Sequence, residues 1–361
     1  MSKKSALSQS EGSAPTSNLN PSSAKRIRTF RKKGISVEEL FQKILKGDTT
    51  ALSQGITLVE SSQPQHQKKA AELVEKCLPH ANRSIRIGIT GVPGVGKSTF
   101  IEALGTYLGD SGKRVAVLAV DPSSTVSRGS ILGDKTRMEK LVTHKNAYIR
   151  PSPSGDSLGG VARKTRESIV LCEAAGFDTL LIETVGVGQS ETTVHSMTDF
   201  FLLLKLAGAG DELQGIKRGI IEMADAIVIN KADGENRKPA ERARAEFRRA
   251  LHLYPPKESG WIPKVLLSSA LEQKGIKEIW DLIETFQETV KQNQQFEHKR
   301  HEQNKFWLVQ TIDEHLKNRF YRHPEIKIAL KEQLLAVERN ETTAFAAATF
   351  LLEKYNHLKM V

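Results

Sequence analysis

Apolar residues in the middle of the chain form short runs that alternate with glycine turns and helical stretches. These runs predict strands at residues 85–90, 115–121, 179–183, 200–206, 226–230 and 264–268. Strands that alternate with helices are typical of a parallel sheet with helices on both faces. We therefore expect an α/β fold built around a mainly parallel sheet.

Both ends of the chain have helical patterns instead. Ser36 and Glu39 have capping-box spacing before an apolar run at helical intervals, and two further helices are expected between residues 50 and 77. A C-terminal apolar stripe at helical spacing precedes a break at His323-Pro324. Its members are Phe306, Val309, Ile312, Leu316 and Phe320. Burial against a second subunit and packing on the chain's own α/β domain both explain this stripe.

Positive charge is concentrated at the N-terminus. The formal net charge is +11, and the first 33 residues hold eight Lys or Arg against one Glu in a segment rich in Ser, Asn and Pro. Such a segment buries too little apolar surface to order itself, so residues 1–34 are expected to be a disordered basic tail. A mitochondrial transit peptide is the alternative. Nucleic-acid binding is not expected, because the tail nearly lacks aromatic residues.

Cysteine content and hydropathy bear on the compartment. Cys77 and Cys172 are the two cysteines, and they have neither metal-ligand spacing nor the pattern of a disulfide framework. No apolar run approaches the roughly 20 residues that cross a bilayer, so no membrane association is expected. We expect a cytoplasmic protein, or a protein of the mitochondrial matrix if the tail is a transit peptide.

A complete phosphate-binding motif follows the first expected strand. Residues 91–98 read Gly-Val-Pro-Gly-Val-Gly-Lys-Ser, which matches G-x-x-x-x-G-K-[ST] between a strand and a helix. Backbone N–H groups of such a loop surround the phosphates, the lysine reaches the β and γ phosphates, and the serine coordinates Mg²⁺. Lys97 is also expected to be catalytic, and Ser98 to bind the metal. The expected nucleotide contacts are Gly91, Gly94, Val95, Gly96, Lys97, Ser98 and Thr99.

An acidic strand tip provides a second element that faces the phosphates. Glu183 ends an apolar strand, and Gly186 follows it in the place where many GTPases carry Asp-x-x-Gly. A carboxylate there can hold Mg²⁺ directly or through water, and the glycine N–H can reach the γ-phosphate. We therefore expect Glu183 to be a metal ligand and a catalytic residue.

The residues expected to read the base follow two later strands. Residues 230–233 read Asn-Lys-Ala-Asp, the guanine-reading arrangement of GTPases. Asp233 can accept hydrogen bonds from both N1–H and the N2 amine of guanine, a donor pair that adenine lacks. The backbone after the last strand fits a contact to guanine O6. GTP and GDP are therefore the expected nucleotides, and their base contacts are Asn230, Lys231, Asp233, Ser269 and Ala270.

Four longer blocks carry a resemblance to one family. They lie at residues 121–124, 129–138, 183–190 and 208–217, and they closely resemble the MeaB/ArgK family of P-loop GTPases. The resemblance covers roughly residues 36–355. It implies a P-loop GTPase domain and a chaperone role on an adenosylcobalamin-dependent acyl-CoA mutase, with methylmalonyl-CoA mutase as the first candidate. GTP would then gate cofactor loading and protection of the mutase.

The resemblance also places roles on particular residues. It implies an acidic cluster for Mg²⁺ and switching, formed by Asp121, Asp134 and Glu183. It implies a third switch loop that responds to the partner and contains Asp211, Gln214 and Lys217. Brought near the phosphates by a bound partner, Lys217 could neutralise transition-state charge as an arginine finger does. The catalytic set is thus expected to include Asp134, Gln214 and Lys217, although Lys217 could equally be a solvated surface lysine.

The expected organisation combines these patterns with the resemblance. It has a tail over residues 1–34, a helical segment over 35–84, the GTPase domain over 85–290 and a helical dimerisation segment over 291–361. Two other functions stay open: a kinase of a periplasmic amino-acid-binding protein, and a GTPase that inserts nickel or cobalt. Neither a groove for a protein substrate nor a histidine cluster is visible, so both rank behind the mutase chaperone.

Overall fold

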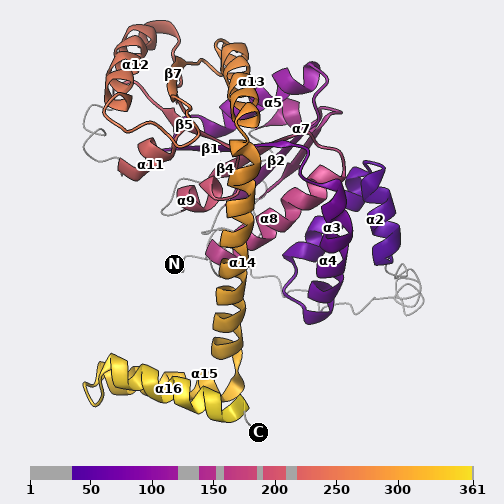
Figure 1. The fold of residues 1–361 in the computed structure, drawn as a ribbon, viewed down its shortest axis with the longest axis vertical. Coiled ribbons are helices and arrows are strands. Elements are labelled where there is room, and N and C mark those ends of the chain that lie inside the picture. The colour runs from indigo at the N-terminus through magenta and orange to yellow at the C-terminus, as the bar shows by residue number, and fades with distance from the viewer. Residues whose placement is uncertain (1–34, 121–137, 152–157, 185–189, 209–217, 360–361) are drawn as a thin grey trace, which may run out of the picture.

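A seven-stranded sheet forms the centre of the protein (Figure 1). The computed structural model describes residues 35–120, 138–151, 158–184, 190–208 and 218–359. The strand order is β3-β2-β4-β1-β5-β6-β7, and all neighbouring strands are parallel. The strands are β1 (Ile85–Gly91), β2 (Val115–Val120), β3 (Ala147–Arg150), β4 (Thr179–Thr184), β5 (Phe200–Lys205), β6 (Ala226–Ile229) and β7 (Lys264–Leu267). The expected α/β fold is confirmed.

Each strand expected from the sequence is present and ends within one residue of its expected bound, and β3 is an addition. β3 is four residues long, lies at one edge of the sheet and pairs with β2. Of its side chains, that of Tyr148 is buried and the other three are half-buried. A strand this short, with a covered neighbour on one side, leaves no clear alternation in the sequence.

Helices precede, separate and follow the strands. Those of the N-terminal part are α2 (Val37–Leu45), α3 (Thr49–Glu60), α4 (Pro64–Cys77) and η1 (Leu78–His80). Those between strands are α5 (Lys97–Asp110), α7 (Glu139–Val142), α8 (Leu158–Ala174), α9 (Ser190–His195), α11 (Arg218–Met223), η2 (Gly234–Asn236) and α12 (Arg237–Leu251). Those after the sheet are α13 (Ile276–Gln292), α14 (Gln295–Arg322), α15 (Pro324–Glu338) and α16 (Ala344–Lys359). Within the described ranges, none of these helices combines the length and apolar character needed to cross a bilayer.

Alternate strand residues face two different layers of helices. Ile87 and Val117 pack in one core cluster with α5 and α13. Leu118 and Ile182 pack in the opposite cluster, which includes α3, α4 and α8. This alternation is the period of two that a strand imposes on its side chains. Because both faces are covered, the strands read as continuous apolar runs in the sequence.

The N-terminal helices form a small bundle against α8. The Ser36 side chain accepts a hydrogen bond from the backbone N–H of Glu39 at 3.1 Å, so the expected N-cap of α2 is confirmed. Asp48 caps α3 in the same way. Arg150 of β3 pairs with Glu60 of α3, which ties the bundle to the edge of the sheet.

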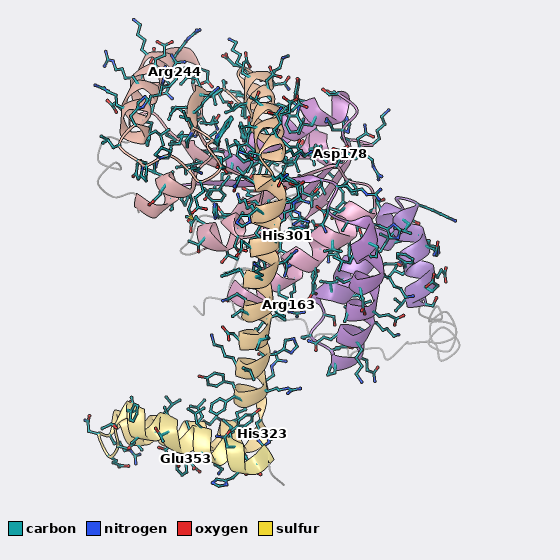
Figure 2. All side chains as sticks on the ribbon, in the orientation of Figure 1. Arg163, Asp178, Arg244, His301, His323 and Glu353 are labelled. Carbon is teal, nitrogen blue, oxygen red and sulfur yellow. The ribbon has the colours of Figure 1, made fainter. Side chains whose placement is uncertain are left out.

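The C-terminal helix α14 has two contrasting halves. Its first half crosses the body of the protein, and its second half extends beyond it to α15 and α16 (Figure 1). The helix ends at Arg322 and α15 begins at Pro324, as expected from the sequence. Most of the apolar stripe is only half covered: Phe306, Val309, Ile312 and Leu316 are 46%, 55%, 49% and 53% exposed, whereas Phe320 packs against Tyr355 of α16. Figure 2 shows side chains projecting from this half of the helix above His323.

Candidate nucleotide site

The phosphate loop lies at the carboxyl end of β1, a central strand whose seven residues are all buried. At Gly91, a Cβ atom would lie 2.6 Å from the carbonyl oxygen of Leu204 on β5. Gly96 has φ +90°, and a Cβ atom there would lie 3.0 Å from Nδ2 of Asn230. Other residues would collide or be strained at these positions. The two glycines therefore allow the loop to pack closely against the neighbouring strand ends.

Lys97, the first residue of α5, directs its ammonium group back onto this loop. Nζ donates to the carbonyl oxygens of Gly91 at 2.8 Å and Val92 at 3.3 Å. Burial lowers the pKa of Lys97, and the negative charges of Glu183 and Glu191 oppose that shift. A phosphate group beside Nζ would offset the same desolvation, so this position suits an anion.

β4 places Glu183 beside the phosphate loop. Glu183 is in register with Ile89 of β1 and is 6% exposed. The Ser98 hydroxyl donates to its Oε1 at 3.4 Å. At the same strand ends, the Thr184 hydroxyl donates to the Thr90 hydroxyl at 2.8 Å, a contact that no sequence pattern predicts. A serine hydroxyl and a carboxylate thus meet at the carboxyl edge of the sheet.

The loops after β6 and β7 meet beside the phosphate loop. Asn230 donates from Nδ2 to the carbonyl oxygen of Val95 at 2.9 Å, and its Oδ1 is buried without a hydrogen-bond partner among the described residues. Asp233 accepts a hydrogen bond from the Ser269 hydroxyl at 2.5 Å, a pairing that the sequence alone did not indicate. Lys231 has φ +57°, a left-handed conformation that turns the chain between them. A cavity of about 320 Å³ lies between these two loops.

The described candidates from four separate segments therefore gather at one edge of the sheet. They are Gly91, Gly94, Val95, Gly96, Lys97, Ser98, Thr99, Glu183, Asn230, Lys231, Asp233, Ser269 and Ala270. The remaining candidates fall outside the described residues, and these are Asp121, Asp134, Gly186, Asp211, Gln214 and Lys217. In the described part of the chain, no three or more His, Cys, Asp or Glu side chains form a metal-binding group.

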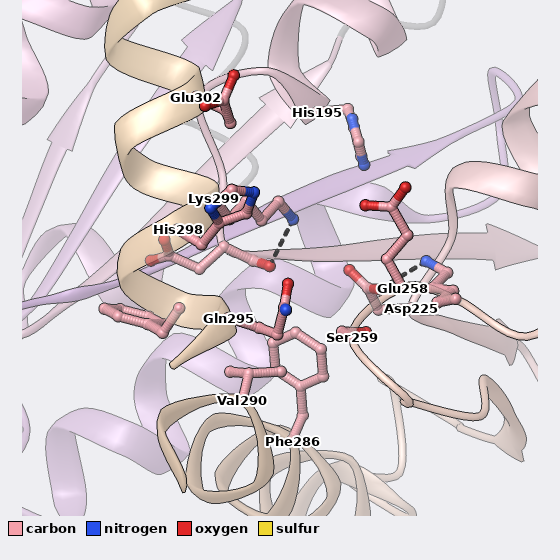
Figure 3. A pocket seen from close by; sticks show the side chains of 13 residues that line it. His195, Asp225, Glu258, Ser259, Phe286, Val290, Gln295, His298, Lys299 and Glu302 are labelled. Carbon is pink, nitrogen blue, oxygen red and sulfur yellow. Dashed lines mark hydrogen bonds and ion pairs between the residues drawn. The ribbon is translucent and has the colours of Figure 1, made fainter. Parts of the chain in front are cut away.

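A second cavity, of about 280 Å³, lies at the opposite edge of the sheet, where β5 and β6 begin (Figure 3). Its charged groups bind other parts of the chain: Lys257 donates to Asp225 at 2.6 Å, and Lys299 donates to the carbonyl oxygen of Asp199 at 2.8 Å. Burial, followed by the charge of Lys299, lowers the pKa of His195 to about 4. These two lysines are thus paired with other groups of the chain.

Comparison with known families assigns the chain. The model of the methylmalonyl-CoA mutase-associated GTPase MeaB matches residues 52–325, well over half of the sequence. The chain belongs to the MeaB family. Among its relatives, a probable GTPase of Mycobacterium tuberculosis is 50% identical to it over 321 residues, which cover 89% of this chain and 96% of the relative. The mitochondrial methylmalonic aciduria type A homolog of Mus musculus is 46% identical over 313 residues, covering 84% and 74% of the two chains.

A solved structure agrees with this assignment to the MeaB family. The crystal structure of LAO/AO transport system kinase superposes with a TM-score of 0.70 at 38% sequence identity, and it covers 89% of this chain and 97% of its own. The family model, the relatives named GTPase and the P-loop fold together identify this MeaB-family protein as a nucleotide-binding enzyme that hydrolyses GTP. The resemblance that the sequence blocks indicated is therefore confirmed.

Proposed function

We propose that this GTPase is a chaperone of an adenosylcobalamin-dependent acyl-CoA mutase, with methylmalonyl-CoA mutase as the first candidate. It uses GTP to gate cofactor loading and to protect the mutase. The observation that carries the proposal is the family match, because the family description names association with methylmalonyl-CoA mutase and the match spans residues 52–325. The relative from Mus musculus supports it through a name that refers to methylmalonic aciduria.

The residues at the carboxyl edge fit a Mg²⁺-bound guanine nucleotide. Ser98 Oγ and Glu183 Oε1 are oxygen donors 3.4 Å apart, close enough to approach one cation, and oxygen is the ligand that Mg²⁺ prefers. Mg²⁺ would supply charge neutralisation on the β and γ phosphates. Ser98, Glu183, Asp121 and Asp134 would hold it, and Lys97 would bind the same phosphates.

The base would lie against the loops after β6 and β7. Asn230 fixes its loop to the phosphate loop through Val95, which makes the base site and the phosphate site one unit. The Asp233 carboxylate would accept hydrogen bonds from the two guanine donors, either in place of the Ser269 hydroxyl or in addition to it. Lys231 would lie along the base, and the backbone of Ser269 and Ala270 would contact O6.

Hydrolysis is proposed to depend on the partner. The proposed catalytic residues are Lys97, Asp134, Glu183, Gln214 and Lys217. Beside them, Gly186 would offer its N–H to the γ-phosphate. If Lys217 acts only when the partner is bound, turnover should be slow alone and faster with the mutase. Arginine fingers supply about 10³ to 10⁵ in rate, which sets the largest stimulation to expect.

A direct test measures phosphate release with and without methylmalonyl-CoA mutase. We expect stimulation by the mutase that Lys217→Ala abolishes, while Lys277→Ala, an exposed lysine on α13, serves as the matched control. Equal rates with every acyl-CoA mutase tested would contradict the proposed partner. A pull-down from the native host, followed by an adenosylcobalamin-binding assay on the captured protein, identifies the partner independently.

A kinase activity is the second candidate, because a solved relative is titled a transport system kinase. GTP labelled at the γ-phosphate separates the two activities. Label released as inorganic phosphate supports the GTPase alone, whereas label transferred to a periplasmic amino-acid-binding protein would establish the kinase. The metal-insertion alternative gains no support from the described residues, which contain no metal-binding group of the kind such a role needs.

The second half of α14 is proposed to mediate a homodimer of a cytoplasmic protein, with the mitochondrial matrix as the alternative location. Its half-exposed apolar stripe is a row of side chains that water would otherwise cover. Ile312→Glu with Leu316→Glu should convert a dimer to a monomer in sedimentation experiments. His315→Glu, an exposed polar position between them, should leave the dimer intact.

A further inference from the structure

The first half of α14 contacts residues 196–199, which join α9 to β5 and are called here the exit of α9. Three side chains on one face of α14 donate hydrogen bonds to successive parts of this segment. Trp307 Nε1 donates to the carbonyl oxygen of Ser196 at 3.1 Å, and Gln303 Nε2 donates to that of Thr198 at 2.8 Å. Lys299 Nζ donates to that of Asp199 at 2.8 Å. The three donors are spaced by four residues, so they lie in one row along the helix.

An ion pair anchors one end of this row. Arg300 donates from Nε and Nη2 to the two carboxylate oxygens of Asp199, at 2.9 and 2.7 Å. Asp199 also accepts from the backbone N–H of Arg86 on β1 at 2.8 Å. Both partners are almost fully buried, with side chains 8% and 3% exposed. Asp199, the last residue before β5, is therefore bound both to the sheet and to α14.

The other end of the row is packed but has free space beside it. Trp307 is 4% exposed and belongs to the same core cluster as Val194 and Met197, which lie in and just after α9. The Arg166 guanidinium lies 5.5 Å from the centre of its ring. A cavity of about 350 Å³ adjoins Trp307 between α8, α9 and α14. Core packing thus holds α9 to α14 at Trp307, and the adjoining cavity leaves room for a small rearrangement there.

We propose that Gln303 and Trp307 are positioning residues for GTP hydrolysis, acting through α9. This inference rests on the proposed function. α9 lies directly on β1, the strand that ends in the phosphate loop: a Cβ atom at Gly88 of β1 would lie 3.0 Å from the Val194 side chain of α9. By fixing the exit of α9, Gln303 and Trp307 determine where α9 can lie. They would therefore affect the rate of hydrolysis more than the binding of nucleotide.

The same residues connect the nucleotide site to the C-terminal helices. α14 continues fifteen residues past Trp307, to Arg322, which is about 22 Å at the rise of an α-helix. A continuous helix transmits displacement along its length, so a contact on its second half reaches the exit of α9. Such coupling is reciprocal: a ligand that moves α9 must also change the affinity of whatever binds the distal half of α14.

Enzyme kinetics test the positioning role. Gln303→Met and Trp307→Phe each remove one donor while keeping most of the packing volume. We expect kcat to fall about five- to tenfold, the worth of one hydrogen bond, while the Kd for GTP stays within about threefold of the parent. Lys305→Gln is the matched control, because Lys305 lies on the same helix, is exposed and pairs with Glu302. Its kcat should equal that of the parent.

Intrinsic fluorescence provides a readout that simple loss of packing would not produce. Replacing GDP by a non-hydrolysable GTP analogue should change the tryptophan emission of the parent. The change should persist in Trp261→Phe and Trp280→Phe and disappear in Trp307→Phe, which identifies Trp307 as its source, and it should be reduced in Gln303→Met, where Trp307 is intact. A change that persists in Trp307→Phe, or kcat values equal to the parent in both donor variants, would overturn the positioning role.

These measurements separate a failure of the positioning role from a failure of the guanine-nucleotide site. If Gln303→Met and Trp307→Phe bind and hydrolyse GTP like the parent, the positioning role is wrong and the guanine-nucleotide site stands. If the parent itself does not bind GTP, the proposed site is wrong before α9 is considered. Thermal unfolding of both variants within a few degrees of the parent ensures that a lower kcat does not come from unfolded protein.

Discussion

The two edges of the sheet handle buried charge in opposite ways. At the carboxyl edge, Lys97 has backbone carbonyls as its hydrogen-bond partners, and Asn230 keeps a buried oxygen without a partner among the described residues. At the amino edge, Asp199 has Arg300 and a backbone N–H, and Glu173 has Arg86. The first arrangement places an ammonium group and an amide oxygen where a ligand could pair with them, whereas the second pairs its buried carboxylates with arginines of the same chain. The candidate ligand-binding groups thus lie at the carboxyl ends of the strands, and the buried ion pairs that hold the chain together lie at the amino ends.

The amino edge should give the largest effect on stability. Arg300→Met leaves the Asp199 carboxylate buried with the backbone N–H of Arg86 as its remaining strong donor, and breaking a buried pair costs about 3–5 kcal/mol. Chemical denaturation should measure a loss of this size. The double variant Arg300→Met with Asp199→Asn should recover part of it. A loss below about 1 kcal/mol in the single variant would mean that this pair does not hold α14 to the sheet.

The carboxyl edge should give the largest effect on specificity. Asp233→Ala removes the acceptor of two guanine hydrogen bonds, each worth about 1.5–3 kcal/mol when one partner is charged. GTP affinity should therefore fall about 100-fold or more, with little change in the unfolding temperature. Ser269→Ala removes the hydroxyl that contacts Asp233 and is the matched comparison, with a smaller expected loss. Unchanged preference for GTP over ATP in Asp233→Ala would contradict the assignment of the base site.

A smaller effect should appear in the pH dependence of stability. Burial alone would raise the pKa of Asp199, but the charge and hydrogen bonds of Arg300 lower it overall. A lowered carboxyl pKa stabilises the folded state above the pKa of the unfolded chain, about 3.9, and this contribution is lost as pH falls through the folded value. Stability should thus decline below about pH 4, and Asp199→Asn should flatten that decline. An identical acid profile in both proteins would show that Asp199 does not contribute to it.

The contrast between the edges also explains what could be predicted from the sequence. The phosphate loop, the tip of β4 and the Asn-Lys-Ala-Asp segment are local patterns at strand ends, and parallel strands bring their carboxyl ends to one edge. The grip of α14 on the exit of α9 joins residues more than 100 positions apart, such as Trp307 and Ser196. No local period encodes such a pair. The sequence therefore predicted which segments meet at the carboxyl edge of the sheet, but not the contacts that α14 makes at the exit of α9.

The burial of side chains along α14 could not be predicted from the sequence either. Its apolar stripe has one spacing along the chain, and this spacing is the same whether a helix is covered or not. In the structure Trp307 is 4% exposed while Ile312, five residues later, is 49% exposed. Trp307 and Ile312 lie on different faces of α14, and the stripe residue Phe306, next to Trp307, is itself 46% exposed. Which face of the helix is covered depends on the tertiary fold. Edge strand β3 was missed for the related reason that four residues carry too little pattern.

The central claim is that the amides of the glycine loop, the Lys97 ammonium and the acidic strand tip bind a guanine nucleotide through its phosphates. Calorimetric titration of GTP and ATP into the parent and Lys97→Ala, with Lys277→Ala as the control, tests it most directly. We predict that the parent and Lys277→Ala bind GTP alike and prefer it over ATP, whereas Lys97→Ala binds GTP about 100-fold more weakly or worse. Equal GTP affinity in Lys97→Ala, or ATP binding as tight as GTP binding in the parent, would contradict the account.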